Sequence, residues 1–222
     1  MTAEERRSLR VFITRKRCEI LGKQPYDTND IIIPPYLKIT ATPIPPEHPD
    51  NSFLLFDSNE DGDDASSKIL IFASADMRFK ASIATELFAD GTYRIVPRWF
   101  ATLYTIHFVI DGVPYPIFFC LTKNEREETF MRIMSVVKEY LTKFNECRII
   151  HTDCQRSAIN AFKQTFGCRV KTCLFHINQT LWRYISKVGL ATAYNDANKP
   201  QLHGWVRRLM AFPFMKAERM TD

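Results

Sequence analysis

The sequence predicts an α/β domain built on a mixed, five-stranded sheet, with the element order β-β-β-α-β-α-β-α and helices on both faces. Three observations lead to this prediction. Three β-rich segments with short links, between residues 86 and 121, favour an antiparallel meander. Segments of helical periodicity then alternate with short apolar segments, which is typical of parallel strands joined by helices. Apolar residues make up 45% of the 222 residues, enough for one sizeable core.

The predicted meander is recognised by its β-branched and aromatic residues and by the turns between its strands. Its three strands are expected at residues 86–96, 101–110 and 113–121. Asp111 and Gly112 form a hairpin signal between the second and third strands. The prolines of the third strand fall at its start, where they do not interrupt central pairing. An apolar run at 68–73, with the length of a short strand, and a short helix at 76–85 precede the meander.

The second half of the predicted domain alternates helices and strands. The helices are expected at 125–144, 155–166 and 176–188, and the strands at 147–152 and 169–175. Each helix has apolar residues at spacings of three and four, and Gly189 suits the C-terminal cap of the last one. An antiparallel meander joined to parallel strands in this order is the ribonuclease-H-like fold.

The chain is expected to divide into three parts: residues 1–66, a core at 67–190, and residues 191–222. The first part combines a basic cluster between Arg6 and Arg17 with a proline-rich and then acidic irregular stretch. The basic cluster favours either a solvated helix or one that touches nucleic acid. The acidic stretch lacks the glutamate that a calcium-binding loop requires at its twelfth position.

Composition and charge limit the classes of protein. The net charge of +5 permits contact with a polyanion without requiring it. The six cysteines form no compact framework, and the N-terminus lacks the apolar core of a signal peptide. No apolar run has the length of a membrane span. We therefore expect an intracellular protein with reduced thiols and no membrane partner.

Two aspartates stand beside predicted buried strands. Asp90 lies within the first strand of the meander, and Asp153 follows the strand at 147–152. Two carboxylates that a mixed sheet brings together are the core of a divalent-metal site for phosphodiester chemistry. The alternatives are structural: a turn or bulge at Asp90-Gly91, and an N-terminal cap of the following helix at Asp153. Capping and metal binding at Asp153 are compatible.

Several motifs in order resemble the transposase domain of Mutator-like elements. They are Phe-Ala-Asp-Gly-Thr-Tyr at residues 88–93, Leu-Tyr-Thr-Ile-His at 103–107, Ile-His-Thr-Asp at 150–153, and Cys-Leu-Phe-His-Ile-Asn-Gln-Thr-Leu-Trp-Arg at 173–183. The likeness covers about residues 69–190, with the expected secondary structure between the motifs.

This resemblance implies a DNA transposase of the three-acid type, acting on element ends in the nucleus. Asp90 and Asp153 would be the first and second acids, and both would bind Mg²⁺ or Mn²⁺. Cys173 and His176 match a Cys-x-x-His motif of the family. Their chemistry would allow zinc, although two ligands do not close a zinc site, and the alternative is packing where strand meets helix.

The third acid of the family, a glutamate on a later helix, has no evident counterpart. Glu218 is the only glutamate after His176, and it comes too early. The sequence therefore resembles a C-terminally truncated transposase in which residues 191–222 begin a helical insertion. Two classes compete: a transposase that is inactive alone, and a domesticated, non-catalytic derivative that binds DNA or protein.

Overall fold

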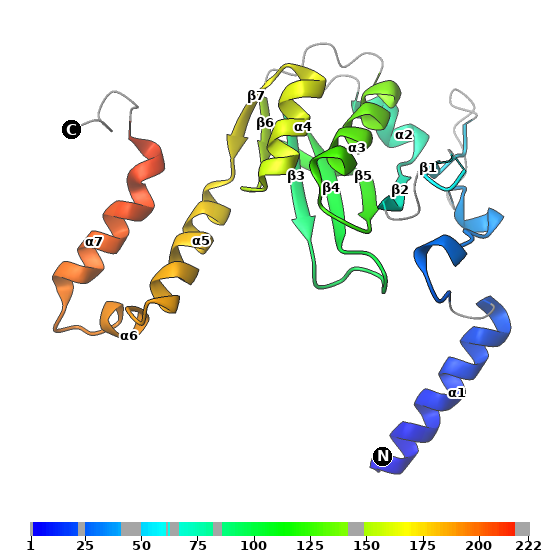
Figure 1. The fold of residues 1–222 in the computed structure, drawn as a ribbon, viewed down its shortest axis with the longest axis horizontal. Coiled ribbons are helices and arrows are strands. Elements are labelled where there is room, and N and C mark those ends of the chain that lie inside the picture. Colours follow the sequence, from blue (N-terminus) through cyan, green and yellow to red (C-terminus); the bar gives the residue numbers. More distant parts are fainter. Residues whose placement is uncertain are drawn as a thin grey trace.

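The computed structural model describes residues 2–21, 25–40, 50–60, 62, 67–81, 86–141 and 149–215. Seven strands form one mixed sheet with the order β1-β2-β5-β4-β3-β6-β7 (Figure 1). The strands are β1 (Leu54–Asp57), β2 (Ile69–Phe72), β3 (Glu86–Thr92), β4 (Thr102–Ile110), β5 (Val113–Thr122), β6 (Ile149–Thr152) and β7 (Arg169–Thr172).

Helices flank the sheet along the chain. The α-helices are α1 (Ala3–Leu21), α2 (Ala75–Ala81), α3 (Glu127–Tyr140), α4 (Arg156–Phe166), α5 (Leu174–Lys187), α6 (Ala191–Tyr194) and α7 (Pro200–Ala211). Short 3₁₀ turns cover Thr28–Asp30, Pro35–Leu37 and Phe212–Phe214. The mixed α/β class is therefore as predicted.

The meander is also confirmed. Strands β3, β4 and β5 are consecutive and antiparallel, and β6 and β7 add to β3 in parallel. The turn between β4 and β5 has positive φ at Asp111 and Gly112, as the type I′ hairpin requires. The central strands alternate buried and half-exposed residues, since one face of the sheet meets the core.

The prediction of five strands was wrong, because the sheet has seven. The apolar run at 68–73 contains β2, which pairs antiparallel with β5. Strand β1 then pairs with β2 from a segment that the sequence indicated to be irregular. As an edge strand, β5 would have unpaired backbone donors and acceptors; β2 pairs with them, and β1 in turn pairs with β2.

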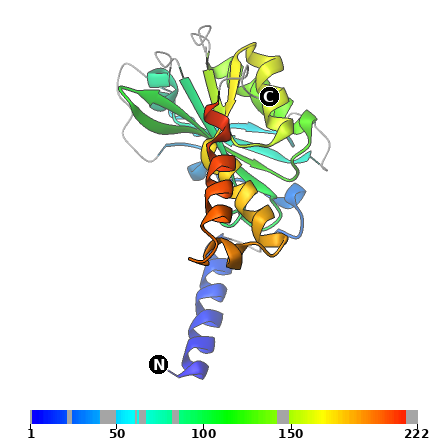
Figure 2. The ribbon, with the colours of Figure 1, turned by 90° about the vertical axis from the view of Figure 1, so that its left-hand side faces the viewer.

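One face of the sheet is covered by α3 and α4, which pack against each other (Figure 2). Their apolar residues meet Tyr104, Ile106 and Ile150 in a continuous buried core. The other face of the central strands is only partly covered within the described residues, since Phe88 is 37% exposed. Helix α5 leaves the sheet beyond β7 and packs against α7 instead (Figure 1).

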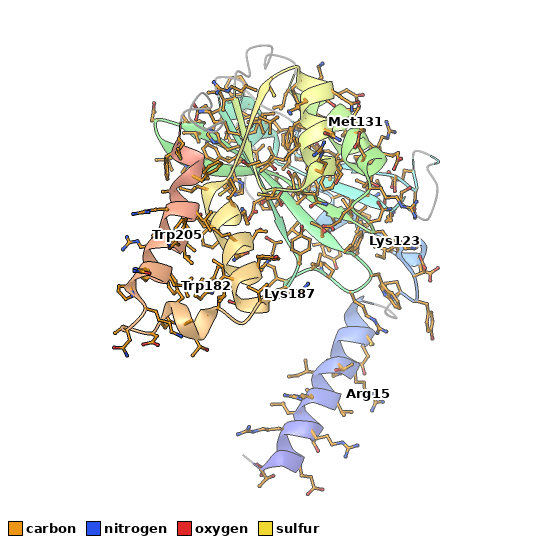
Figure 3. All side chains as sticks on the ribbon, turned by 60° about the vertical axis from the view of Figure 1, so that its left-hand side comes forward. Arg15, Lys123, Met131, Trp182, Lys187 and Trp205 are labelled. Atoms are coloured by element: carbon orange, nitrogen blue, oxygen red, sulfur yellow. The ribbon has the colours of Figure 1, made fainter. Side chains whose placement is uncertain are left out.

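The two ends of the chain extend away from the sheet. Helix α1 projects from it, and every α1 residue whose burial is described is exposed. Figure 3 shows Arg15 on α1, Trp182 on α5 and Trp205 on α7. Among the described residues, none of the helices combines the length and hydrophobicity that a membrane span requires.

Replacing Gly167 by alanine is expected to lower the free energy of unfolding by about 1 kcal/mol. Gly167 ends α4 with a φ of 63°, and its N–H donates to the carbonyl of Lys163. A Cβ there would meet no atom within 4 Å, so the cost comes from the backbone conformation alone. Urea denaturation measures the effect. Gly204→Ala, in the interior of α7, is the control and should not destabilise; equal losses would contradict this reading.

Candidate active site

Asp90 lies within a regular part of β3. Asp90 and Gly91 pair with Thr105 and Tyr104 of β4, and the register between these strands has no shift. The alternative of a turn or bulge at Asp90-Gly91 is therefore wrong. The register explains why Asp90 and its neighbour Phe88 point to the half-covered face, since side chains alternate along a strand.

Asp153 follows the last residue of β6, the strand parallel to β3. Because Thr152 pairs with Ala89, Asp153 comes directly beside Asp90 at the carboxyl end of β6. Its Oδ1 accepts a hydrogen bond of 3.1 Å from the N–H of Gln155, and the Thr152 hydroxyl lies 3.4 Å away. The N-terminal cap of α4 is Gln155, so the predicted cap at Asp153 was wrong. Asp153 holds the turn before α4 through Oδ1, which leaves its second oxygen, Oδ2, available for another role.

The pKa of Asp153 is raised, first by burial and further by the nearby charge of Asp90. Hydrogen bonding to Gln155 and the charge of His176 act in the opposite direction. Because the charge of Asp90 acts on Asp153, the two carboxylates lie within electrostatic reach of each other. A bound cation would relieve both the repulsion and the cost of burial.

His176 faces Asp90 from the first turn of α5. Its Nε2 lies 3.4 Å from Asp90 Oδ1, without hydrogen-bond geometry. Asp90 Oδ1 and His176 Nδ1 are both buried atoms that lack a hydrogen-bond partner. A buried carboxylate oxygen without a hydrogen bond, such as Asp90 Oδ1, marks a place where a ligand would be stabilising.

The Cys-x-x-His motif joins β7 to α5. The predicted strand at 169–175 ends earlier, at Thr172, so Cys173 is the residue before α5. The Cys173 N–H donates to the carbonyl of Thr152 at 2.7 Å, which ties α5 to the residue before Asp153. Within the described residues, no three His, Cys, Asp or Glu side chains are grouped so that they could hold a metal ion. Zinc at Cys173 and His176 therefore stays a prediction, and Glu218 lies outside the described residues.

A second set of polar residues around Asp153 was not predicted from the sequence. The Tyr93 hydroxyl donates to Gln155 Oε1 at 3.1 Å, and the Thr102 hydroxyl donates to Glu125 Oε1 at 2.6 Å. The pKa of Tyr93 is raised, first by burial and then by Glu125, so its hydroxyl stays protonated at neutral pH. In the sequence, the one sign that Tyr93 belongs to this site was that it follows Asp90 closely in the same motif.

His151 belongs to the half-covered face. Its ring stacks on Phe88 with a centroid distance of 4.3 Å and an interplanar angle of 6°. Its Nε2 lies 3.7 Å from Glu86, and burial lowers its pKa. His151 is thus held by neighbouring strands.

Comparison with known families identifies the core of this domain. Residues 87–180 match the family model of the MULE transposase domain, so this part of the chain is a Mutator-like transposase domain. None of the curated proteins compared with the chain matches it. The matched residues include Asp90, Asp153, Cys173 and His176.

The side chains present suit a hard divalent cation. Carboxylate oxygens are the preferred ligands of Mg²⁺ and Mn²⁺, and the buried Asp90 Oδ1 lacks a hydrogen bond. Asp90 and Asp153 would supply two ligands, and water or substrate would supply the others, because Mg²⁺ prefers an octahedral shell. The two side chains therefore fit a metal site with open coordination positions, to which further ligands could bind.

Proposed function

We propose that the domain is the catalytic domain of a metal-dependent DNA transposase with a ribonuclease-H-like fold. The observation that supports this most is the adjacency of Asp90 and Asp153 at parallel strands β3 and β6, inside the matched domain. The order β5-β4-β3-β6-β7, a meander followed by parallel strands, supports the fold assignment. Strands β1 and β2 would then be additions at the β5 edge.

The proposed chemistry is cleavage and joining of phosphodiester bonds. Divalent cations, when bound, activate the attacking water or 3′-hydroxyl and stabilise the leaving oxygen. Asp90 and Asp153 would hold them. The N–H of Gln155 orients Asp153 by binding Oδ1, while His176 lies against Asp90 and limits its rotation. The closeness of the two acids makes a cation the natural partner of both.

DNA is the proposed partner, and the nucleus the proposed location. Two basic regions could bind phosphates without reading sequence: the exposed helix α1, with Arg6, Arg10 and Arg15, and Arg207 and Arg208 of α7. These regions lie in the proposed flanking parts, residues 1–66 and 191–222, on either side of the core at 67–190.

The proposed function has two versions, which differ in whether the protein retains a metal site for DNA cleavage. The described residues provide two acids and no third ligand, so we propose that this chain alone binds cations weakly and does not cleave DNA. A second candidate is a domesticated derivative that binds DNA or protein without catalysis, and the same missing ligand favours it. Metal binding separates them, because a derivative freed from catalysis has no need of a cation at these two acids.

The test is Mn²⁺ binding by titration calorimetry. Asp90→Asn and Asp153→Asn should each weaken Mn²⁺ binding by more than the roughly 10–100-fold that loss of an outer-shell partner costs, because each removes a direct ligand. Asp111→Asn is the matched control, since this exposed turn residue has a positive φ that asparagine tolerates.

Equal affinities in the wild type and both variants would remove these acids from the site. A nicking assay with Mn²⁺ and a linear duplex completes the test. We expect no cleavage by this chain alone, and cleavage that Asp90→Asn abolishes would show that the active site is complete without a further acid.

A further inference from the structure

Tyr93 reaches the candidate site from the end of β3. The residue is 54% exposed, yet its hydroxyl donates to Gln155 Oε1 at 3.1 Å. The N–H of the same Gln155 donates to Asp153 Oδ1 at 3.1 Å. Gln155 therefore accepts from Tyr93 through its side chain and donates to Asp153 through its main chain.

Gly91 provides the space for this arrangement. A Cβ at residue 91 would lie 3.1 Å from the Tyr93 hydroxyl oxygen and 3.3 Å from Asp153 Oδ2. Both polar atoms therefore border the same point beside β3, and each is closer to it than an ordinary Cβ contact allows. The missing side chain lets the hydroxyl and the carboxylate come close to the strand and to each other.

Glu125 is a neighbour of Tyr93, because its charge contributes to the raised pKa of the Tyr93 hydroxyl. Its carboxylate is anchored by the Thr102 hydroxyl at 2.6 Å, and its carbonyl oxygen accepts from the Ser157 hydroxyl at 3.0 Å. These bonds fix the loop between β5 and α3 to β4 and α4. The hydroxyl of Tyr93 therefore donates its one proton to Gln155, with the anchored Glu125 nearby.

We propose that Tyr93 is a positioning residue for the metal-binding acid Asp153, acting through Gln155. This inference rests on the proposed function, because it assigns Tyr93 to the outer shell of the same cation site. Fixing Gln155 fixes the N–H that holds Asp153 Oδ1, and a held Oδ1 sets the direction of Oδ2. Ligating carboxylates commonly depend on such outer hydrogen bonds, and losing one weakens metal binding by about 10–100-fold.

The experiment compares Mn²⁺ affinities by titration calorimetry in the whole chain. Tyr93→Phe removes only the hydroxyl and should weaken binding about 10-fold, at the lower end of the outer-shell range. Gln155→Ala removes the acceptor and keeps the main-chain N–H, so a similar loss is expected. Because both act through one bond, the double variant should lose no more than either single variant. Tyr115→Phe, on the exposed start of β5, is the matched control and should bind as the wild type does.

A merely structural role for Tyr93 predicts a different pattern. If the role is only structural, Tyr93→Phe lowers the thermal midpoint and leaves the Mn²⁺ affinity of the folded protein unchanged. That result would overturn the inference. Additive losses in the double variant would also overturn it, since Tyr93 and Gln155 would then act separately. Asp153→Asn distinguishes a failure of this inference from a failure of the proposed metal site. If Asp153→Asn loses affinity and Tyr93→Phe does not, only this inference fails. If neither variant changes binding, or the wild type does not bind Mn²⁺, the proposed metal site fails and this inference fails with it.

Discussion

Lys68→Met is expected to lower the free energy of unfolding by about 3–5 kcal/mol, because it leaves a buried carboxylate without its cation. Lys68 is 0% exposed, and its Nζ pairs with Asp57 Oδ1 at the junction of β1 and β2. Asp57 is also buried, and its carboxylate accepts a further hydrogen bond from the N–H of Asn59, at 2.9 Å. One N–H does not neutralise a buried charge, so the edge strands should loosen. Urea denaturation followed by circular dichroism measures the loss.

The double variant Asp57→Leu/Lys68→Met separates charge from packing. Replacing both partners by apolar side chains removes the unpaired charge, so most of the lost stability should return. Lys80→Met is the control for the loss of a lysine, since its bond to Asp76 is exposed and should change stability by less than about 1 kcal/mol. A Lys68→Met variant no less stable than Lys80→Met would show that the buried pair contributes nothing.

The parts of the fold that could be predicted are those whose signals are local. The hairpin at Asp111-Gly112 and the apolar spacing of α3 lie within short stretches, and each stretch largely determines its own structure. Strand β1 could not be predicted, because its four residues follow a proline-rich stretch and acquire their strand form by pairing with β2. The path of α5 was equally hidden: its periodicity predicts a helix, but not that the helix packs on α7 rather than on the sheet.

The candidate site likewise contains residues that the local sequence could predict and contacts that it could not. Asp90 and Asp153 could be placed from the sequence, because each stands at a recognisable strand and strand order brings the two strands together. The bond between Tyr93 and Gln155 spans 62 residues, and no local pattern indicates it. The contact between His176 and Asp90 is similar, since the Cys-x-x-His spacing suggests a metal pair with Cys173 and not an approach to the first acid.

Phe130→Ala is expected to cost about 3–5 kcal/mol, a large part of the roughly 5–15 kcal/mol that stabilises a domain. Phe130 is a fully buried residue of α3, and its ring meets Tyr104 edge-on with a centroid distance of 4.9 Å. Removing the ring leaves a cavity that rigid strands cannot fill. Phe214→Ala, at a position that is 75% exposed, is the control and should change stability by no more than about 0.5 kcal/mol.

Phe130→Ala should also affect the candidate site, because Tyr104 contacts both Phe130 and Thr152. The Tyr104 hydroxyl lies 2.8 Å from the Thr152 hydroxyl, and Thr152 immediately precedes Asp153. A Tyr104 ring without its support should shift toward the cavity and disturb Thr152, so Mn²⁺ binding by the folded fraction should weaken as well. Phe130→Leu fills most of the space and should largely preserve both stability and affinity. Full Mn²⁺ affinity in a folded but destabilised Phe130→Ala protein would contradict this link. It would show that the core stabilises the fold but does not determine the position of Asp153.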